Sequence, residues 1–202
     1  AKQQLPIEDL TKRAEAFGHQ YVELWQTLES NTIGGKRFRP RMVMAAYQSL
    51  GGTDLEAAAC IGAAFELLHT ALIVHDDVID HATLRRGAET ANTIWGMEPV
   101  ILAGDYLHAH AMALASEVGG PAAMALIGRA TAAMVESEFL QMHNAQESII
   151  SEEKYFQVLM GKTAALIAAA CEAGIAHNQG SPEQRPRLLG HLPLGREEEV
   201  RE

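Results

Sequence analysis

Three aspartates and two arginines lie close together in the middle of the chain, and their types suit chemistry on a metal and a phosphate. Asp76, Asp77 and Asp80 end an apolar run, and Arg85 and Arg86 follow them. If the run is helical, Asp76 and Asp80 are one turn apart on the same face. Two such carboxylates repel each other until a divalent cation lies between them, and hard oxygen ligands suit Mg²⁺ that carries a phosphate. Because paired arginines match phosphate geometry, the stretch predicts a metal-diphosphate site.

A solvated helix end is the alternative interpretation of this pattern, because acidic residues followed by arginines also occur where a helix meets water. The apolar run from Phe65 to Val74 favours the site, since such a run should be buried and should open toward the interior of a helical bundle. His69 lies seven residues before Asp76 and therefore on the same helical face. It is either a packed core histidine or part of the site.

Two further groups of basic residues could bind phosphate. The segment GGKRFRP, residues 34–40, combines two glycines that allow close approach to a ligand with cations that include Lys36 and Arg39. Surface decoration is the alternative interpretation of this loop. Lys162 and Thr163 lie in an otherwise apolar predicted helix. A lysine in that setting is costly unless it meets an anion, which again indicates phosphate.

Composition and periodicity predict an all-α protein. Hydrophobic residues make up 48% of the 202 residues, charged residues 21% and aromatic residues only 5%. Together with abundant alanine, these values favour closely packed helices. The length suffices for one large domain or two small ones, and we expect a single helical domain over residues 1–202. We find no period-two strand pattern and expect helices at about 6–30, 41–50, 54–80, 99–117 and 121–146, with another opening at Ser151. In the helix at 121–146 the expected core positions are Met124, Ile127, Met134, Val135 and Leu140.

Charge and cysteine usage narrow the partners and the location. A net charge of −10 argues against nucleic acid as a general partner. Cys60 and Cys171 are expected to be buried free thiols in a reducing compartment. The first residues, AKQQLPIEDLTKR, lack the apolar core of a signal peptide. No uninterrupted apolar run reaches the roughly 18 to 20 residues of a membrane span. We therefore expect a cytoplasmic protein with no transmembrane segment.

Four motifs occur in a recognisable order: GGKRFRP, then DDVID with RRG after it, then GDYLHAHA, then GKTA. Together they resemble the trans-type polyprenyl (isoprenyl) diphosphate synthases of the geranylgeranyl or longer-chain type, over roughly residues 30–176. Residues 177–202 form an atypical tail. The resemblance implies an isoprenoid synthase-like helical bundle around a central cavity, usually a homodimer. Terpene cyclases also carry an aspartate-rich motif on a helical bundle, but a cyclase has no second diphosphate substrate for GGKRFRP and RRG to hold.

The resemblance also implies a reaction and roles for individual residues. The reaction is Mg²⁺-dependent head-to-tail condensation of isopentenyl diphosphate with an allylic prenyl diphosphate. Asp76 and Asp80, with Asp77 in the same motif, would hold the Mg²⁺ that bridges the allylic diphosphate. The same diphosphate would be contacted by Arg85, Lys162 and Thr163. Isopentenyl diphosphate would be bound by Lys36, Arg39, His69 and Arg86.

The resemblance implies that product length depends on residues one turn before the aspartate-rich motif. Here these are Ala71 and Leu72, and neither is aromatic. By the resemblance, an aromatic residue at position 71 would indicate a fifteen-carbon product. Ala71 leaves the floor of the cavity open, so we expect geranylgeranyl diphosphate (C20) or longer.

The chain departs from the family in its last part. The resemblance implies a second aspartate-rich motif on a later helix, but no aspartate follows Asp105. One explanation is that a segment between about Pro182 and Leu192 is missing from this sequence. The other is a genuinely short paralogue that acts as a non-catalytic, diphosphate-binding or regulatory subunit of a heteromeric prenyl synthase. The first is the expectation, because the ligands of the first half are intact.

Overall fold

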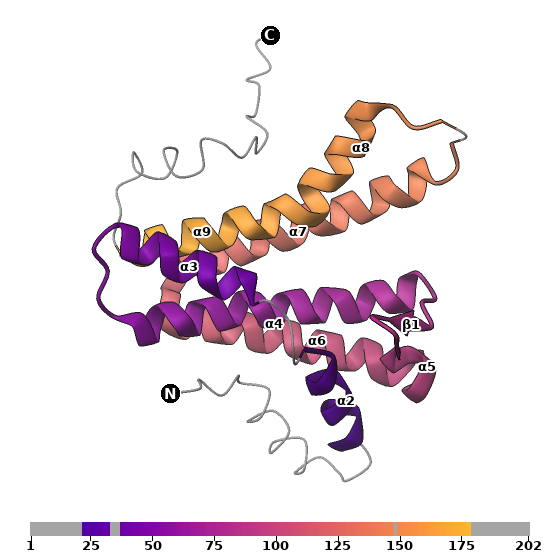
Figure 1. The fold of residues 1–202 in the computed structure, drawn as a ribbon, viewed down its shortest axis with the longest axis horizontal. Helices are drawn as coiled ribbons and strands as arrows, with labels where there is room; N and C mark the ends of the chain where they lie inside the picture. Colours follow the sequence, from indigo (N-terminus) through magenta and orange to yellow (C-terminus); the bar gives the residue numbers. More distant parts are fainter. Residues whose placement is uncertain (1–21, 33–36, 148, 179–202) are drawn as a thin grey trace. The chain divides into compact units, whose positions relative to one another are not determined.

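The structure is a computed structural model that describes residues 22–32, 37–147 and 149–178 (Figure 1). Most of these residues are helical, which confirms the predicted all-α class. The chain divides into two compact units. The first comprises residues 1–38 and 66–113, and the second comprises residues 39–65 and 114–202. Of the helix predicted at 6–30, only the last part lies within the described residues. The tail beyond residue 178 lies outside them.

The first unit is built on the second part of a long helix, α4. Its elements are α2 (Val22–Thr32), the residues of α4 (Leu55–Ile79) from position 66 onward, β1 (Leu84–Arg85), β2 (Ala88–Glu89), α5 (Ala91–Trp95) and nearly all of α6 (Met97–Leu114). Leu67 and Leu68 of α4 and Val100 and Leu107 of α6 are almost completely buried. They form the apolar core on which the polar end of α4 is built.

Aromatic contacts hold α2 in the first unit. The Trp25 and Tyr106 rings lie 5.1 Å apart between centroids, so α2 packs against α6. The Trp95 indole N–H donates a hydrogen bond of 3.3 Å to the Thr27 hydroxyl, which ties α2 to α5. Tilted aromatic pairs of this kind stabilise a contact beyond the area that they bury.

Helix α4 ends in a Schellman motif directly after the aspartates. The backbone N–H of His81 donates to the Val78 carbonyl at 3.3 Å, and that of Ala82 donates to the Asp77 carbonyl at 2.9 Å. His81 has a φ of 51°, the left-handed conformation that this motif requires. At the other end, Asp54 caps the helix by accepting from the Ala57 N–H at 3.0 Å. The helix predicted at 54–80 is therefore confirmed almost to the residue.

A small hairpin, which the sequence analysis did not predict, follows α4. Leu84 pairs with Glu89 and Arg85 pairs with Ala88 in antiparallel register. Arg86 and Gly87 form the two-residue turn, with φ values of 55° and 84°. Positive φ at both positions defines a type I′ turn, whose twist matches that of an antiparallel pair. Strands of two residues are too short to show an alternating pattern, which explains why periodicity missed them.

The second unit is a set of closely packed helices. Its elements are α3 (Phe38–Ser49) from position 39, the first part of α4, the π-helical turn η2 (Ala115–Gly119), α7 (Gly120–Asn144), α8 (Glu152–Leu159), the π-helical turn η3 (Met160–Ala164) and α9 (Ala165–His177). Helices α7 and α9 pack against each other, and both bury small residues, among them Ala123, Ala130, Ala169 and Ala173. Small side chains allow two helix backbones to approach closely, as the alanine-rich sequence predicted.

The predicted core positions of α7 are only partly correct. Ile127 is fully buried, whereas Met124, Met134 and Leu140 are half-buried. Val135 is 44% exposed, so its assignment to the core was wrong. Ala130 and Ser137, which are buried, lie on the side of α7 that faces its neighbours in this unit. Helical spacing shows that a helix has an apolar face, but it does not show how far that face is covered by other elements.

The two cysteines are free and half-buried rather than fully buried. Burial raises the pKa of both the Cys60 and the Cys171 thiol. A raised thiol pKa leaves little of the nucleophilic thiolate at neutral pH, which agrees with a passive packing role.

Three stretches of the described chain, Leu55–Ile79, Met97–Asn144 and Glu152–His177, are long and apolar enough to cross a membrane by length and composition alone. The sequence analysis considered only uninterrupted apolar runs, and so it overlooked apolar helices that contain a few charged residues. In α4, 61% of the most apolar window is buried inside the protein. Packing within the fold therefore accounts for much of the apolar character of α4.

Candidate metal and diphosphate site

The carboxylates of Asp76 and Asp80 lie together at the end of α4. A carboxylate oxygen of Asp76 lies within 4.8 Å of one of Asp80. The Asp80 N–H donates to the Asp76 carbonyl at 2.8 Å, so the helical spacing is kept beyond the last residue of α4. Asp76 is half-buried and Asp80 is exposed. Two hard oxygen donors at this separation, open to solvent on one side, fit Mg²⁺ that keeps further positions for water or phosphate.

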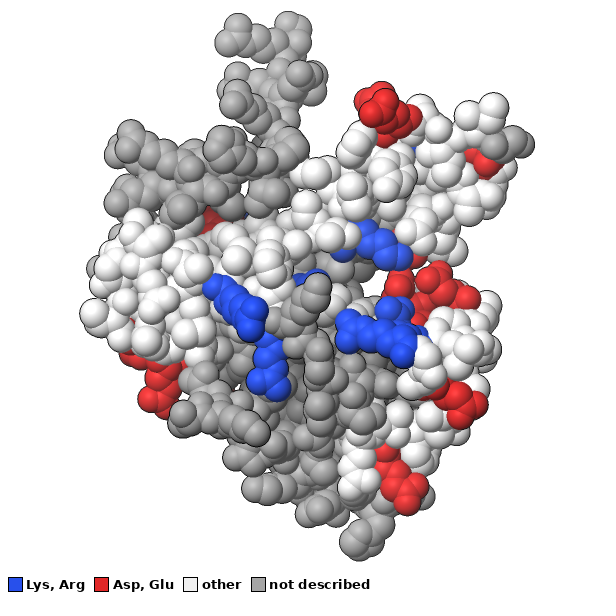
Figure 2. Space-filling view, viewed as in Figure 1, with Lys and Arg blue, Asp and Glu red and all other residues white. Residues whose placement is uncertain are grey.

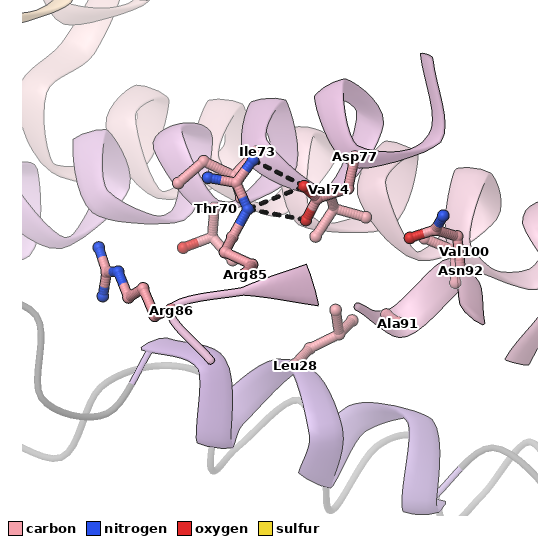
Figure 3. Close-up of a pocket in the computed structure, with 10 residues that line it drawn as sticks. All are labelled: Leu28, Thr70, Ile73, Val74, Asp77, Arg85, Arg86, Ala91, Asn92 and Val100. Carbon is pink, nitrogen blue, oxygen red and sulfur yellow. Dashed lines mark hydrogen bonds and ion pairs between the residues drawn. The ribbon is translucent and has the colours of Figure 1, made fainter. Parts of the chain in front are cut away.

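Asp77 lies on another side of the same turn and is engaged by Arg85 (Figure 3). The Arg85 Nε lies 2.8 and 2.9 Å from the two Asp77 carboxylate oxygens, and Nη2 lies 2.6 Å from Oδ1. The Asp77 side chain is only 10% exposed. This hydrogen bonding, together with the nearby carboxylates, raises the pKa of the Arg85 guanidinium. The geometry therefore makes Asp77 the anchor of Arg85, and Asp76 and Asp80 are the pair of this unit whose carboxylate oxygens could hold a metal ion.

Arg85 and Arg86 are adjacent in sequence but differ in their surroundings. Arg85 also reaches to 3.6 Å from Asp76, so it spans the two aspartates. Arg86 is exposed in the type I′ turn, and Figure 3 shows its guanidinium pointing away from the Arg85–Asp77 pair. Within the described part of the chain, no hydrogen bond or ion pair holds Arg86. One arginine is therefore fixed beside the aspartates, and the other remains available to an anion.

A pocket of the first unit lies beside this ion pair. Its walls come from α2, α4, the hairpin, α5 and α6, and they consist of Leu28, Thr70, Ile73, Val74, Asp77, Arg85, Arg86, Ala91, Asn92 and Val100. The loop at its edge is held by two bonds to the Ala82 carbonyl, from the Thr90 hydroxyl at 2.6 Å and from the Asn92 amide at 3.0 Å. These bonds fix the path from α4 into the hairpin, and with it the position of the arginines.

The remaining predicted residues of the first unit lie on α4 before the aspartates. His69 is half-buried and lies two helical turns before Asp76, hence on the same face as predicted. Ala71 is 1% exposed and Leu72 is half-buried. The continuous helix thus places the small residue Ala71 in the core below the acidic end.

Lys162 and Thr163 belong to the second unit, where they lie in the π-helical turn η3. Lys162 Nζ lies 2.9 Å from Glu138 Oε2 and 3.2 Å from Gln141 Oε1, and its side chain is 29% exposed. The sequence analysis expected an anion near this lysine, and the structure places the Glu138 carboxylate there. The contact of Lys162 with phosphate stays a prediction. Thr163 is exposed.

The turn η3 packs closely against α7. A Cβ at Gly161 would overlap the Ser137 hydroxyl and would come within 2.9 Å of the Ala133 carbonyl. This glycine therefore permits the approach that brings Lys162 to Glu138. Short π-helical turns inside α-helices frequently mark functional positions. The role of this segment in binding phosphate stays a prediction.

Of the two predicted phosphate-binding residues Lys36 and Arg39, only Arg39 lies within the described residues. Arg39 is half-buried in the first turn of α3, in the second unit. Lys36 lies outside the described residues. On the face drawn in Figure 2, lysine and arginine side chains reach the surface alongside acidic ones, although the net charge is −10. Local basic groups of this kind are what a diphosphate would need on an acidic protein.

One histidine beside the site was not singled out from the sequence. His75 immediately precedes Asp76, and its Nε2 lies 3.1 Å from the Ile101 carbonyl and 3.5 Å from Asp105 Oδ1, both on α6. The available signal was its position in HDDVID, directly beside the predicted ligands. That signal does not indicate which way the ring points.

The sequence is similar to a known protein family and to characterised members of it. The polyprenyl synthetase family model matches residues 22–192. Nonaprenyl diphosphate synthase of Mycobacterium tuberculosis is 39% identical over 186 residues, which are 92% of this chain and 53% of that protein. Heptaprenyl diphosphate synthase component 2 of Geobacillus stearothermophilus is 37% identical over 161 residues, 78% of this chain and 50% of that protein.

A solved structure shows the same likeness. A decaprenyl diphosphate synthase from Rhodobacter capsulatus superposes with a TM-score of 0.79 at 33% identity, covering 90% of this chain and 56% of that one. The chain therefore belongs to the polyprenyl synthetase family, and the match extends beyond residues 30–176 at both ends. The chain spans about half the length of the curated relatives that it matches.

Proposed function

We propose that this chain carries the aspartate-rich half of a prenyltransferase that condenses isopentenyl diphosphate with an allylic prenyl diphosphate. The observation that carries the proposal is the end of α4. There Asp76 and Asp80 present a pair of carboxylate oxygens beside a fixed arginine. Membership of the polyprenyl synthetase family supports the reaction type, head-to-tail chain elongation.

In the proposed mechanism Asp76 and Asp80 would hold Mg²⁺. When bound, the metal neutralises diphosphate charge and so favours its departure. Arg85, held rigidly by Asp77, provides a permanent cation that stabilises the same leaving group as the allylic C–O bond breaks and its electron pair passes to the diphosphate. The double bond of isopentenyl diphosphate then forms the new C–C bond, and a proton is lost to the released diphosphate. The apolar residues of α4 exclude water from the allylic carbocation.

The other binding residues are proposed from the family motifs. Arg86, exposed in its turn, would bind isopentenyl diphosphate together with Lys36, Arg39 and His69. Lys162 and Thr163 would contact the allylic diphosphate. For Lys162 a phosphate oxygen would join Glu138 and Gln141 as an acceptor, because an ammonium group carries three N–H donors.

We propose a product of C20 or longer. The small, buried Ala71 one turn below the aspartates supports this length, and the relatives described above include nonaprenyl and decaprenyl diphosphate synthases. A cytoplasmic location and assembly as a homodimer are proposed from the sequence and the family.

The second candidate is a non-catalytic, diphosphate-binding or regulatory subunit of a heteromeric synthase. One observation favours it: one relative is named as component 2 of a heptaprenyl diphosphate synthase. This candidate predicts diphosphate binding without turnover.

One experiment distinguishes the two candidates. The purified 202-residue chain is incubated with Mg²⁺, isopentenyl diphosphate and C10, C15 or C20 allylic diphosphates, and the products are identified by mass spectrometry. Elongated products of C20 or longer, lost in the Asp76→Asn/Asp80→Asn variant, would support the enzyme. Magnesium-dependent binding of an allylic diphosphate without product would support the subunit. Neither binding nor product would contradict both candidates.

A further inference from the structure

We propose that His75 is a positioning residue that fixes the last turn of α4 against α6 and thereby orients the Asp76–Asp80 pair. The inference rests on the proposed function of that pair. Its first support is the contact of the imidazole with α6, where Nε2 lies 3.1 Å from the Ile101 carbonyl and 3.5 Å from Asp105 Oδ1. Ile101 and Asp105 are four residues apart and therefore adjacent on one face of α6.

The hydrogen on Nε2 follows from the groups that it faces. The Ile101 carbonyl can only accept a hydrogen bond, and the Asp105 carboxylate also accepts. Nε2 therefore carries the hydrogen and donates toward both oxygens, with the shorter contact to Ile101. A bond from a side chain of α4 to the backbone of α6 fixes position more firmly than contact between two flexible side chains.

Gly104 provides the space for this ring. A Cβ built at Gly104 would overlap the His75 imidazole, and ring atom Cε1 would lie 3.0 Å away. Gly104 is buried in the interior of α6, where glycine weakens a helix relative to alanine. Close approach of the imidazole gives a physical reason for a glycine at this position. We call His75 and Gly104 together the imidazole clamp.

The clamp acts on the aspartates through the geometry of one helical turn. Successive residues of an α-helix point about 100° apart, as 3.6 residues per turn requires. His75 is directed to α6, and Asp77 is held by Arg85 next to the hairpin. Asp76 lies between these two residues in sequence, so its direction is fixed by anchors on both sides. Asp80, one turn later, has the same direction as Asp76. The Asp76 and Asp80 carboxylates are therefore oriented by His75 and Asp77, neither of which is a proposed metal ligand.

The test uses four variants of the full chain and two measurements. His75→Ala removes the imidazole, His75→Gln keeps an N–H donor at similar reach, and Gly104→Ala displaces the ring without changing it. Gly128→Ala is the matched control, because a Cβ at this exposed helical glycine would meet nothing within 4 Å. The measurements are calorimetric titration with inorganic diphosphate in the presence of Mg²⁺, and thermal unfolding without metal.

His75→Ala and Gly104→Ala should weaken magnesium-dependent diphosphate binding by about tenfold, the lower end of the loss seen when partners that orient metal ligands are removed. His75→Gln should stay within about threefold of the wild type, and Gly128→Ala should match it. Unfolding temperature alone could fall for a merely structural residue, so binding is the deciding measurement.

The proposal is overturned if His75→Ala binds as tightly as the wild type, or if folded His75→Gln loses as much affinity as His75→Ala. A wild-type chain that does not bind diphosphate with Mg²⁺ would instead contradict the proposed function, and the orienting role would fall with it. The two failures are distinguishable because only the second appears in the unaltered protein.

Discussion

Replacing Asp77 by asparagine should distinguish two roles within the group of three aspartates: anchoring Arg85, which we assign to Asp77, and holding the metal, which we assign to Asp76 and Asp80. The substitution keeps the size of the side chain and removes its charge. In the structure this carboxylate accepts hydrogen bonds from Arg85 Nε at 2.8 and 2.9 Å, and it forms an ion pair with Nη2 at 2.6 Å. Its loss should therefore destabilise the protein and release Arg85. It should not remove a metal ligand.

The expected magnitude follows from the burial of the two partners. Hydrogen bonds to charged groups contribute about 1.5–3 kcal/mol, and breaking a fully buried ion pair costs about 3–5 kcal/mol. Asp77 is 10% exposed but Arg85 is 36% exposed, and Asp76 remains 3.6 Å from the guanidinium. Water and Asp76 therefore replace part of the lost interaction. We expect the free energy of unfolding to fall by about 1–3 kcal/mol.

The assay is urea unfolding followed by circular dichroism, combined with a magnesium titration of diphosphate binding. Asp76→Asn and Asp80→Asn are the matched controls. Each should weaken the magnesium dependence strongly and change metal-free stability by less than about 1 kcal/mol. Relief of the repulsion between like charges one turn apart offsets, for Asp76, the loss of its partly exposed contact with Arg85 at 3.6 Å. A double-mutant cycle with Arg85→Gln should give a coupling energy between Asp77 and Arg85 of about 1–3 kcal/mol.

The reasoning is refuted if Asp77→Asn unfolds like the wild type and loses magnesium affinity as severely as Asp76→Asn. That result would make Asp77 a ligand and its contact with Arg85 incidental. Coupling near zero in the double-mutant cycle would contradict the anchoring role directly.

Three further predictions concern other positions of the first unit. Arg86→Asn removes the cation and should raise the KM for isopentenyl diphosphate at least about tenfold. The unfolding temperature should not fall, because asparagine suits a type I′ turn. An unchanged KM would exclude the proposed contact. His81→Gly relieves a left-handed conformation at φ 51° and should raise the free energy of unfolding by about 0.5–1 kcal/mol in urea titrations. Burial is the main cause that lowers the pKa of His108, and the nearby His75 is the second. Between this lowered pKa and the ordinary histidine pKa of about 6.5, the unfolded chain binds more protons than the folded one. Stability should therefore rise with pH in that window and level off above it, and His108→Gln should flatten the slope.

Much of the fold was predictable because its signals are local. The Asp54 cap and the long apolar run define α4 from sequence alone, and the spacing of Asp76 and Asp80 places both on one face as soon as that helix is accepted. The two-residue strands of the hairpin have no periodicity to detect. Their signal was Gly87, whose φ of 84° is natural for glycine and whose position after Arg86 permits a type I′ turn.

The partners of the charged groups were not predictable because they depend on tertiary contacts. Arg85 reaches Asp77 only because the Schellman motif and the hairpin turn the chain back onto α4. Lys162 meets Glu138 because α7 and η3 pack closely through Gly161. For Lys162 sequence reasoning indicated that an anion must lie nearby, but it could not show that a carboxylate of the protein, Glu138, lies there.

The measurement that tests the central claim most directly is calorimetric titration of inorganic diphosphate into the 202-residue chain, with and without Mg²⁺. The account predicts binding only with Mg²⁺ in the wild type, and its loss in Asp76→Asn/Asp80→Asn, a variant whose unfolding temperature stays close to the wild type. Binding of equal strength without Mg²⁺, or in the double variant, would contradict the assignment of the acidic end of α4 as a metal-diphosphate site.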